Sequence, residues 1–233
     1  MLENLPAYIS PIFILTTFAT IGFLLFAVRQ TRPSKTFFIS LAATLIVLLV
    51  VHAILSLNGF YLVNTTPPRF PLGPVPTILI LLVLFFNFGR NLETKSFLQI
   101  LTLLHIVRVP VELVLLWLYQ NGLVPELMTF EGRNFDILSG LTAPFVAWLG
   151  FRHGKINKPL LIGWNLAALG LLFNIVTTAI LSLQTPFQQF AFDQPNRGVL
   201  YFPFIWLPSI IVPIVFVSHV LCLWQLLKRR TAS

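Results

Sequence analysis

The chain has 233 residues, of which 57% are hydrophobic and only 9% are charged. A soluble domain carries roughly 25% charged residues, so this composition excludes a protein that is solvated on all sides. The net charge of +8 is explained by membrane topology and gives no reason to expect a nucleic-acid partner. The single cysteine, Cys222, excludes an intramolecular disulfide and any CxxC metal or redox motif.

Seven apolar segments follow one another along the chain. A helix that crosses a bilayer needs about 20 apolar residues, somewhat fewer where it is short. Helix-stop signals such as Asn58-Gly59 and Asn121-Gly122 separate the segments. The predicted fold class is therefore an all-α polytopic membrane protein with about seven transmembrane helices, and residues 1–233 form a single transmembrane domain. The predicted helices are 8–28, 37–57, 73–89, 96–120, 136–151, 159–184 and 203–227, the third and fifth being short.

The lysines and arginines fall mainly in every other loop. The opposite loops hold only Arg69, Arg133 and Arg197, and Arg108 lies inside a helix. Cytoplasmic loops carry the excess of basic residues, so we predict a multi-pass protein of the cell membrane whose N-terminus is extracytoplasmic and whose C-terminus is cytoplasmic. The basic residues of the predicted cytoplasmic side are Arg29, Arg32, Lys35, Arg90, Lys95, Arg152, Lys155, Lys158, Lys228, Arg229 and Arg230.

Two parts of the sequence are similar to each other. The second predicted helix contains Leu-Ala-Ala at 41–43 and ends with Ala-Ile-Leu-Ser-Leu at 53–57. The sixth contains the same two motifs at 166–168 and 179–183, with one extra residue between them. Either the chain contains a parallel repeat, or these residues recur because they are common in any membrane helix.

A repeat would comprise residues 8–89 and 136–227, joined by the linker helix 96–120. This three-one-three arrangement, in which one linker helix joins two sets of three helices, resembles the topology of small-solute carriers of the sugar-efflux and vitamin-uptake kinds. Their signature motifs are absent from the sequence.

The fourth predicted helix has an unusual polar face. At 100° per residue, Thr102, His105, Arg108 and Glu112 lie on one side of it. Arg108 is roughly 18 Å from the cytoplasmic end of the helix, where a charge costs at least about 2.5–3.5 kcal/mol. Arg108 and Glu112 are four residues apart and can form an ion pair, while Pro110 can kink the helix. The face is either a self-neutralising packing element or a site for a ligand, an ion or a proton.

Other polar residues are candidates for the same site. His219 lies at about the same depth as His105, so the two could share a haem or a metal ion; hydrogen-bonded or proton-relay histidines are the alternative. Asn174 and Thr178 belong to a polar stripe near the middle of the sixth predicted helix. They are expected either to line the same cavity as Arg108 or to form hydrogen bonds between helices.

No catalytic motif occurs in the sequence, so no catalytic residue and no cofactor is assigned. The favoured function is a carrier or channel for a small, anionic or protonatable solute, bound by Arg108, Glu112, His105, Asn174 and Thr178. The alternative is an intramembrane enzyme or redox protein that acts on a lipid, a quinone or haem. The expected partners are a small-molecule ligand and the lipid bilayer, and assembly into a homo-oligomer is left open.

Overall fold

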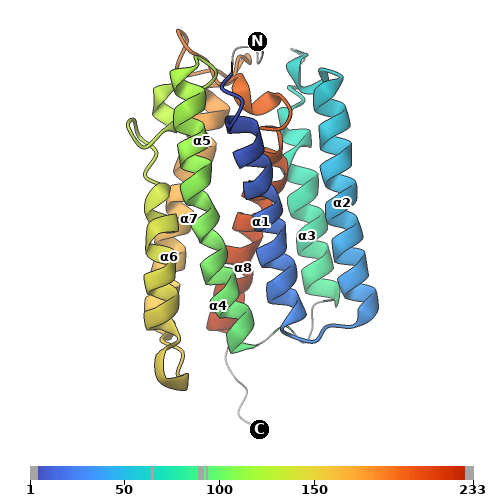
Figure 1. The fold of residues 1–233 in the computed structure, drawn as a ribbon, viewed down its shortest axis with the longest axis vertical. Helices are drawn as coiled ribbons and strands as arrows, with labels where there is room; N and C mark the ends of the chain where they lie inside the picture. The colour runs from blue at the N-terminus through green and yellow to red at the C-terminus, as the bar shows by residue number, and fades with distance from the viewer. Residues whose placement is uncertain (1–4, 64–65, 89–91, 93, 229–233) are drawn as a thin grey trace.

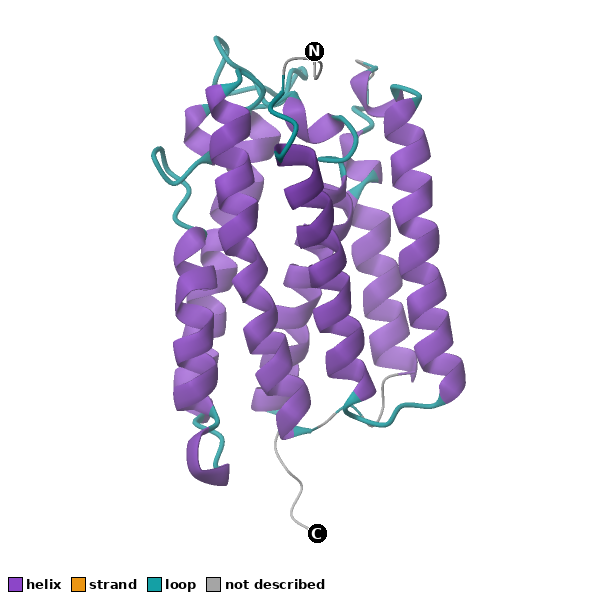
Figure 2. Ribbon diagram, in the orientation of Figure 1, coloured by secondary structure: helices purple, strands orange, loops and turns teal. Residues whose placement is uncertain are grey.

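The computed structural model describes residues 5–63, 66–88, 92 and 94–228. Within these ranges the regular elements are helices, and none is a strand (Figure 2). The α-helices are α1 (Ile9–Arg29), α2 (Lys35–Leu57), α3 (Pro74–Phe88), α4 (Lys95–Leu104), α5 (Arg108–Gln120), α6 (Ile137–Gly150), α7 (Lys158–Leu181) and α8 (Val212–Leu227).

Six helical stretches of the described chain are long and apolar enough to cross a membrane. Their outward-facing side chains include many large apolar residues, such as Leu15, Ile39, Ile46 and Phe173, which suits a lipid environment. The protein is thus an all-helical membrane protein. The six stretches are Ile9–Arg29, Lys35–Leu57, Phe70–Asn87, Lys95–Gln120, Lys158–Leu181 and Leu207–Leu227.

The fifth predicted segment, 136–151, forms the shorter helix α6. Its 14 residues give a length of about 21 Å, compared with about 30 Å for a typical hydrocarbon core. In Figure 1, α6 does not extend as far toward the upper end of the bundle as α5 does. The predicted end of the third helix at Gly89 and the basic residues Arg90, Arg229 and Arg230 lie outside the described residues.

The helix ends have local causes in the sequence. The side chains of Ser34, Thr94 and Asn157 accept hydrogen bonds from backbone N–H groups in the first turns of α2, α4 and α7. At the other ends, Gly59 and Gly122 follow α2 and α5 with φ angles of +69° and +73°. Only glycine adopts this left-handed conformation without strain, so the predicted stop signals do end these helices.

The fourth predicted helix is interrupted where its polar face lies. α4 ends at Leu104, a 3₁₀ turn covers His105–Val107, and α5 begins at Arg108. Pro110 has no N–H to donate to the carbonyl four residues earlier, which accounts for the interruption predicted at this level. α8 is likewise preceded by a π-helical turn, Leu207–Ile211, which contains Pro208.

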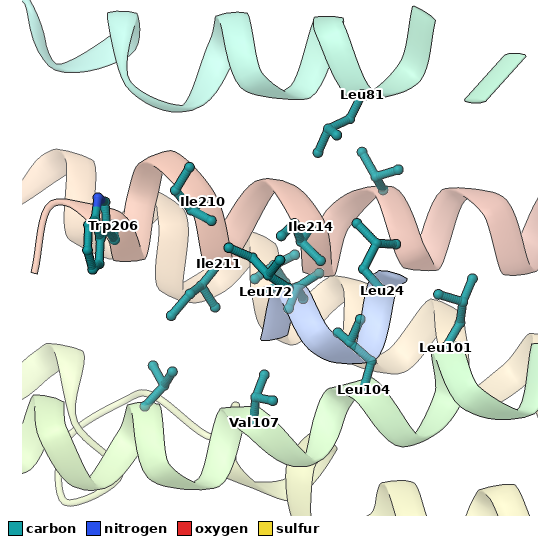
Figure 3. Close-up of a cluster of buried hydrophobic side chains, with 14 of the residues drawn as sticks. Leu24, Leu81, Leu101, Leu104, Val107, Leu172, Trp206, Ile210, Ile211 and Ile214 are labelled. Carbon is teal, nitrogen blue, oxygen red and sulfur yellow. The ribbon is translucent and has the colours of Figure 1, made fainter. Parts of the chain in front are cut away.

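The pair α4–α5 lies at the centre of the bundle. It contacts α1 on one side and α6 on the other, while α3 packs against α8 and α7 packs against α6 and α8. Figure 1 shows the helices running along the long axis of the molecule, and Figure 3 shows part of the core between them. Leu24, Leu104, Leu172 and Ile214 converge there from four different helices. This packing fixes the position of the polar side chains of α4–α5.

Candidate ligand-binding site

Arg108 is the centre of a buried polar cluster and is only 2% exposed. Its Nη1 donates to Asp136 Oδ1 at 2.6 Å and to the carbonyl oxygen of Ala168 at 3.2 Å. Its Nη2 donates to Nε2 of His219 at 2.9 Å. The expected ion pair between Arg108 and Glu112 is therefore wrong: the guanidinium pairs with Asp136, which immediately precedes α6.

Glu112 is held by Asn134 instead. The side-chain nitrogen of Asn134 lies 2.7 and 2.6 Å from the two carboxyl oxygens of Glu112, and 3.0 Å from the carbonyl oxygen of Met128. The side-chain oxygen of Asn134 accepts from the backbone N–H of Asp136 at 3.0 Å. Asn134 thus connects the two acidic residues, and the segment before α6 becomes part of the site.

The two histidines predicted to lie at equal depth are in contact. The rings of His105 and His219 stack with centroids 4.0 Å apart and planes 24° apart. Because Nε2 of His219 accepts from Arg108, its Nδ1 carries the hydrogen and donates to Asn165 Oδ1 at 2.8 Å. His219 is therefore neutral in this arrangement.

His105 has one engaged nitrogen and one free nitrogen. Ser218 donates its single hydrogen to the carbonyl oxygen of Val215 at 2.7 Å, so we assign the hydrogen of the 3.2 Å contact between Ser218 and His105 to Nε2 of the ring. Nδ1 of His105 is then an unprotonated, buried nitrogen without a hydrogen-bond partner. Such a nitrogen can accept a proton or bind a water molecule.

This geometry does not suit a haem or metal ion shared by the two histidines. The nitrogens of stacked rings point outward rather than toward a common point. In addition, Nε2 of His219 already accepts a hydrogen bond from the guanidinium of Arg108. In the part of the chain that the structure describes, no group of three or more His, Cys, Asp or Glu side chains is placed to hold a metal ion.

A cavity, here called the central cavity, adjoins the cluster. Its volume is about 90 Å³, which is enough for several water molecules or a small organic group. Three charged residues line it, Arg108, Glu112 and Asp136, and its other walls are apolar. Those walls are Phe70, Pro74, Val111, Leu115, Met128, Leu172, Ile175, Val176, Ala179, Ile180, Val199, Leu207, Pro208, Ile211, Val212 and Val215.

The remaining predicted site residues lie apart from the cavity. Asn174 is exposed on α7 and donates to the backbone oxygen of Arg133 at 2.9 Å. Thr178 is buried on the same helix but does not line the cavity. The structure thus brings together His105, Arg108, Glu112 and His219, and it does not bring Asn174 and Thr178 to them.

Sequence reasoning missed Asp136 and Asn134 as members of the site. The predicted helix 136–151 puts Asp136 at a helix end and Asn134 in the loop before it, and an N-terminal position of this kind does not indicate a partner for Arg108. The available signal was the burial cost of Arg108, which calls for an anion at its own depth, and an acid at the start of an unusually short helix is a candidate for that anion.

Comparison with known proteins gives one family. The family model described as "Domain of unknown function (DUF8737)" matches residues 65–227, a range that contains every residue of the polar cluster. No curated protein and no solved structure matches the chain. Since the match covers well over half of its length, the chain belongs to the DUF8737 family.

Proposed function

We propose that the protein is a membrane carrier or channel for a small anionic or protonatable solute, which binds in the central cavity beside Arg108. The observation that carries this proposal is that one arginine and two acidic residues line an otherwise apolar cavity. Ionisable groups inside a membrane protein are costly and are usually functional. A carboxylate or phosphate of a solute would take the place of Asp136 or join it on the guanidinium.

The charge balance of the cluster suggests how a proton could take part. Asp136 neutralises Arg108, so an ionised Glu112 would leave the buried cluster with an uncompensated negative charge. A proton on Glu112 removes that charge. In this proposal, Glu112 that has lost its proton competes with Asp136 for Arg108. This competition changes the affinity of Arg108 for an anion.

We further propose seven membrane crossings, with the N-terminus outside. α6 would add the seventh crossing, completed on its outer side by the segment that precedes it, in which Asn134 and Asp136 are buried. In support, α1 begins at the upper end of the bundle and α8 ends at the lower end (Figure 1), as an odd number of crossings requires. Four described basic residues lie at or beside helix ends on the predicted cytoplasmic side: Arg29, Lys35, Lys155 and Lys228.

The helix contacts support the proposed three-one-three repeat. The first helix of each half, α1 or α6, packs against the central α4–α5 pair, and the third helices, α3 and α8, pack against each other. Within each half, the first helix contacts the second and the second contacts the third.

The test is a thermal-shift screen of small carboxylates and phosphate esters on the purified protein, followed by uptake of each hit into proteoliposomes. We expect Glu112→Gln to abolish pH-dependent uptake while the protein stays folded. Glu131→Gln is the matched control, because Glu131 is exposed and does not line the cavity. Uptake by Glu112→Gln with an unchanged pH profile would contradict the proposal.

A second function is favoured by the apolar walls. Ile180 lines the cavity and is 40% exposed on α7, and Val176 beside it is half-buried, so an apolar ligand could enter from the bilayer. This suits an enzyme or redox protein that acts on a lipid or a quinone. Organic extraction and mass spectrometry of the purified protein, together with its visible absorption spectrum, would detect a retained lipid, quinone or haem.

A further inference from the structure

A second cavity, here called the outer pocket, lies beyond the extracytoplasmic ends of the membrane helices in the proposed topology. Its volume is about 320 Å³, which is larger than that of the central cavity. The short helix Phe60–Leu62, the short helix Phe70–Leu72 and the segment after α7 enclose it. Its lining residues are Tyr61, Leu62, Val63, Pro68, Arg69, Phe70, Leu183, Gln184, Thr185, Asn196, Arg197, Leu200 and Tyr201.

The outer pocket contains two arginines and no acidic residue. Arg69 and Arg197 both line it, and they are two of the three arginines that depart from the segregation of basic residues to the cytoplasmic side. Within the described part of the chain, neither forms an ion pair. Two guanidinium groups facing one pocket without a counter-charge repel each other, and an anion between them removes that repulsion.

The immediate surroundings leave both arginines able to bind a ligand. The Arg69 guanidinium lies 4.7 Å from the ring centroid of Phe60, and its Nη1 makes one long hydrogen bond of 3.4 Å to the carbonyl oxygen of Phe60. The Nε of Arg197 is buried without a partner. The side-chain oxygen of Asn196, a residue with no exposed surface, is unpaired as well and can accept a hydrogen bond from a hydroxyl group.

Tyr61, one of the two tyrosines that line the pocket, adds no negative charge. Burial raises the pKa of Tyr61 to about 12, so the hydroxyl stays protonated at neutral pH. This hydroxyl lies 2.7 Å from Nδ1 of His52, whose Nε2 is 3.4 Å from Thr77. The pocket therefore keeps its net positive charge.

We propose that the outer pocket is a binding site for a small oxyanion, a carboxylate or a phosphate group, held between Arg69 and Arg197. The planar guanidinium matches both anions with paired hydrogen bonds. A free solute and the headgroup of an anionic lipid offer the same chemistry. Phe70 lines both the outer pocket and the central cavity, so an anion bound here would be next to a wall of the cavity that contains Arg108. The relation of this anion to Arg108 rests on the proposed transport function, whereas the binding site itself does not.

The test measures binding of inorganic phosphate and of succinate by calorimetry, at constant ionic strength in maltoside micelles. We expect Arg69→Gln and Arg197→Gln each to weaken binding by about tenfold or more, which is typical for loss of a charged hydrogen-bonding partner. Arg133→Gln is the matched control, because Arg133 is the third outer arginine, is exposed and does not line the pocket. We expect Arg133→Gln to change the affinity by less than twofold.

Two results would overturn the proposal: neither anion binds to the wild-type protein, or Arg133→Gln weakens binding as much as the two pocket variants do. Binding that is lost in Arg108→Lys but kept in both pocket variants would also overturn it, while leaving the central site in place. Conversely, an intact outer site with no pH-dependent uptake would refute the transport function alone.

A final experiment distinguishes a free solute from a lipid headgroup as the source of the oxyanion. In nanodiscs that contain phosphatidylglycerol, a headgroup in the pocket should compete with phosphate. Native mass spectrometry should then show fewer retained lipids for Arg69→Gln than for Arg133→Gln. Equal phosphate affinity in micelles and nanodiscs identifies a free solute instead, and both results place an oxyanion in the pocket.

Discussion

Arg108 joins three segments of the bundle through one side chain. Its guanidinium contacts Asp136 before α6, a backbone oxygen of α7 and His219 of α8. We predict that Arg108→Leu lowers the free energy of unfolding by about 3–5 kcal/mol, because it leaves the Asp136 carboxylate buried without its cation. Unfolding in detergent, followed by tryptophan fluorescence, measures this loss.

The double variant distinguishes a broken pair from a general loss of packing. Arg108→Leu combined with Asp136→Leu should recover much of the stability, since apolar pairs often replace buried ion pairs without cost. Arg133→Leu, on an exposed arginine, should leave stability nearly unchanged. A double variant that is as unstable as the sum of its two single variants would show that the pair makes no specific contribution.

Helical periodicity predicted the part of this site that lies on the interrupted helix α4–α5. His105, Arg108 and Glu112 share one face at 100° per residue, and all three are buried together. Periodicity carries no information about a partner that arrives from another segment. Asp136 and Asn134 were therefore missed, and the i, i+4 spacing favoured an Arg108–Glu112 pair that the structure does not contain.

Gly140 of α6 lies close to the backbone of the interrupted helix α4–α5. A Cβ added to Gly140 would lie 2.8 Å from a methyl carbon of Val109 and 3.2 Å from the carbonyl oxygen of His105. We predict that Gly140→Ala destabilises the protein by about 1–3 kcal/mol, because α6 must move away from the interrupted helix α4–α5. The measurement is the midpoint of thermal unfolding.

Gly163 on α7 provides the matched control. A Cβ there meets nothing within 4 Å, so Gly163→Ala should leave the midpoint unchanged or raise it slightly through the better helix propensity of alanine. Equal midpoints for the two variants would mean that α6 tolerates displacement from α4–α5.

Most helix boundaries were predicted to within about three residues because they depend on local chemistry, but the predicted helix 203–227 begins later, with the π-helical turn at Leu207. The stop signals at Asn58-Gly59 and Asn121-Gly122 coincide with left-handed glycines, and Pro110 interrupts its helix at the expected level. The depth at which α6 begins was not predicted. It depends on burial of the preceding segment against α5 and α7, which is a tertiary effect outside the reach of a hydropathy window.

For the whole molecule, the proposed orientation can be tested with single cysteines. Cys222 is 2% exposed, so the native protein provides a background of low reactivity. We predict that a membrane-impermeant maleimide labels Glu131→Cys on intact cells and does not label Lys155→Cys until the membrane is opened. Both positions are exposed in the structure. Labelling of both positions on intact cells would contradict the proposed topology.

The unequal lengths of the helices bear on how the protein deforms the bilayer around it. α2 and α7 are about 35 Å long, whereas α6 is about 21 Å long and faces outward with Leu138, Leu141, Phe145 and Trp148. Lipids beside α6 must compress or tilt to match this short apolar strip, while those beside α2 need not. Hydrophobic mismatch is therefore expected beside α6, the helix that Asp136 immediately precedes. Acyl-chain length would then act on the polar cluster directly, with shorter chains relieving the compression beside it.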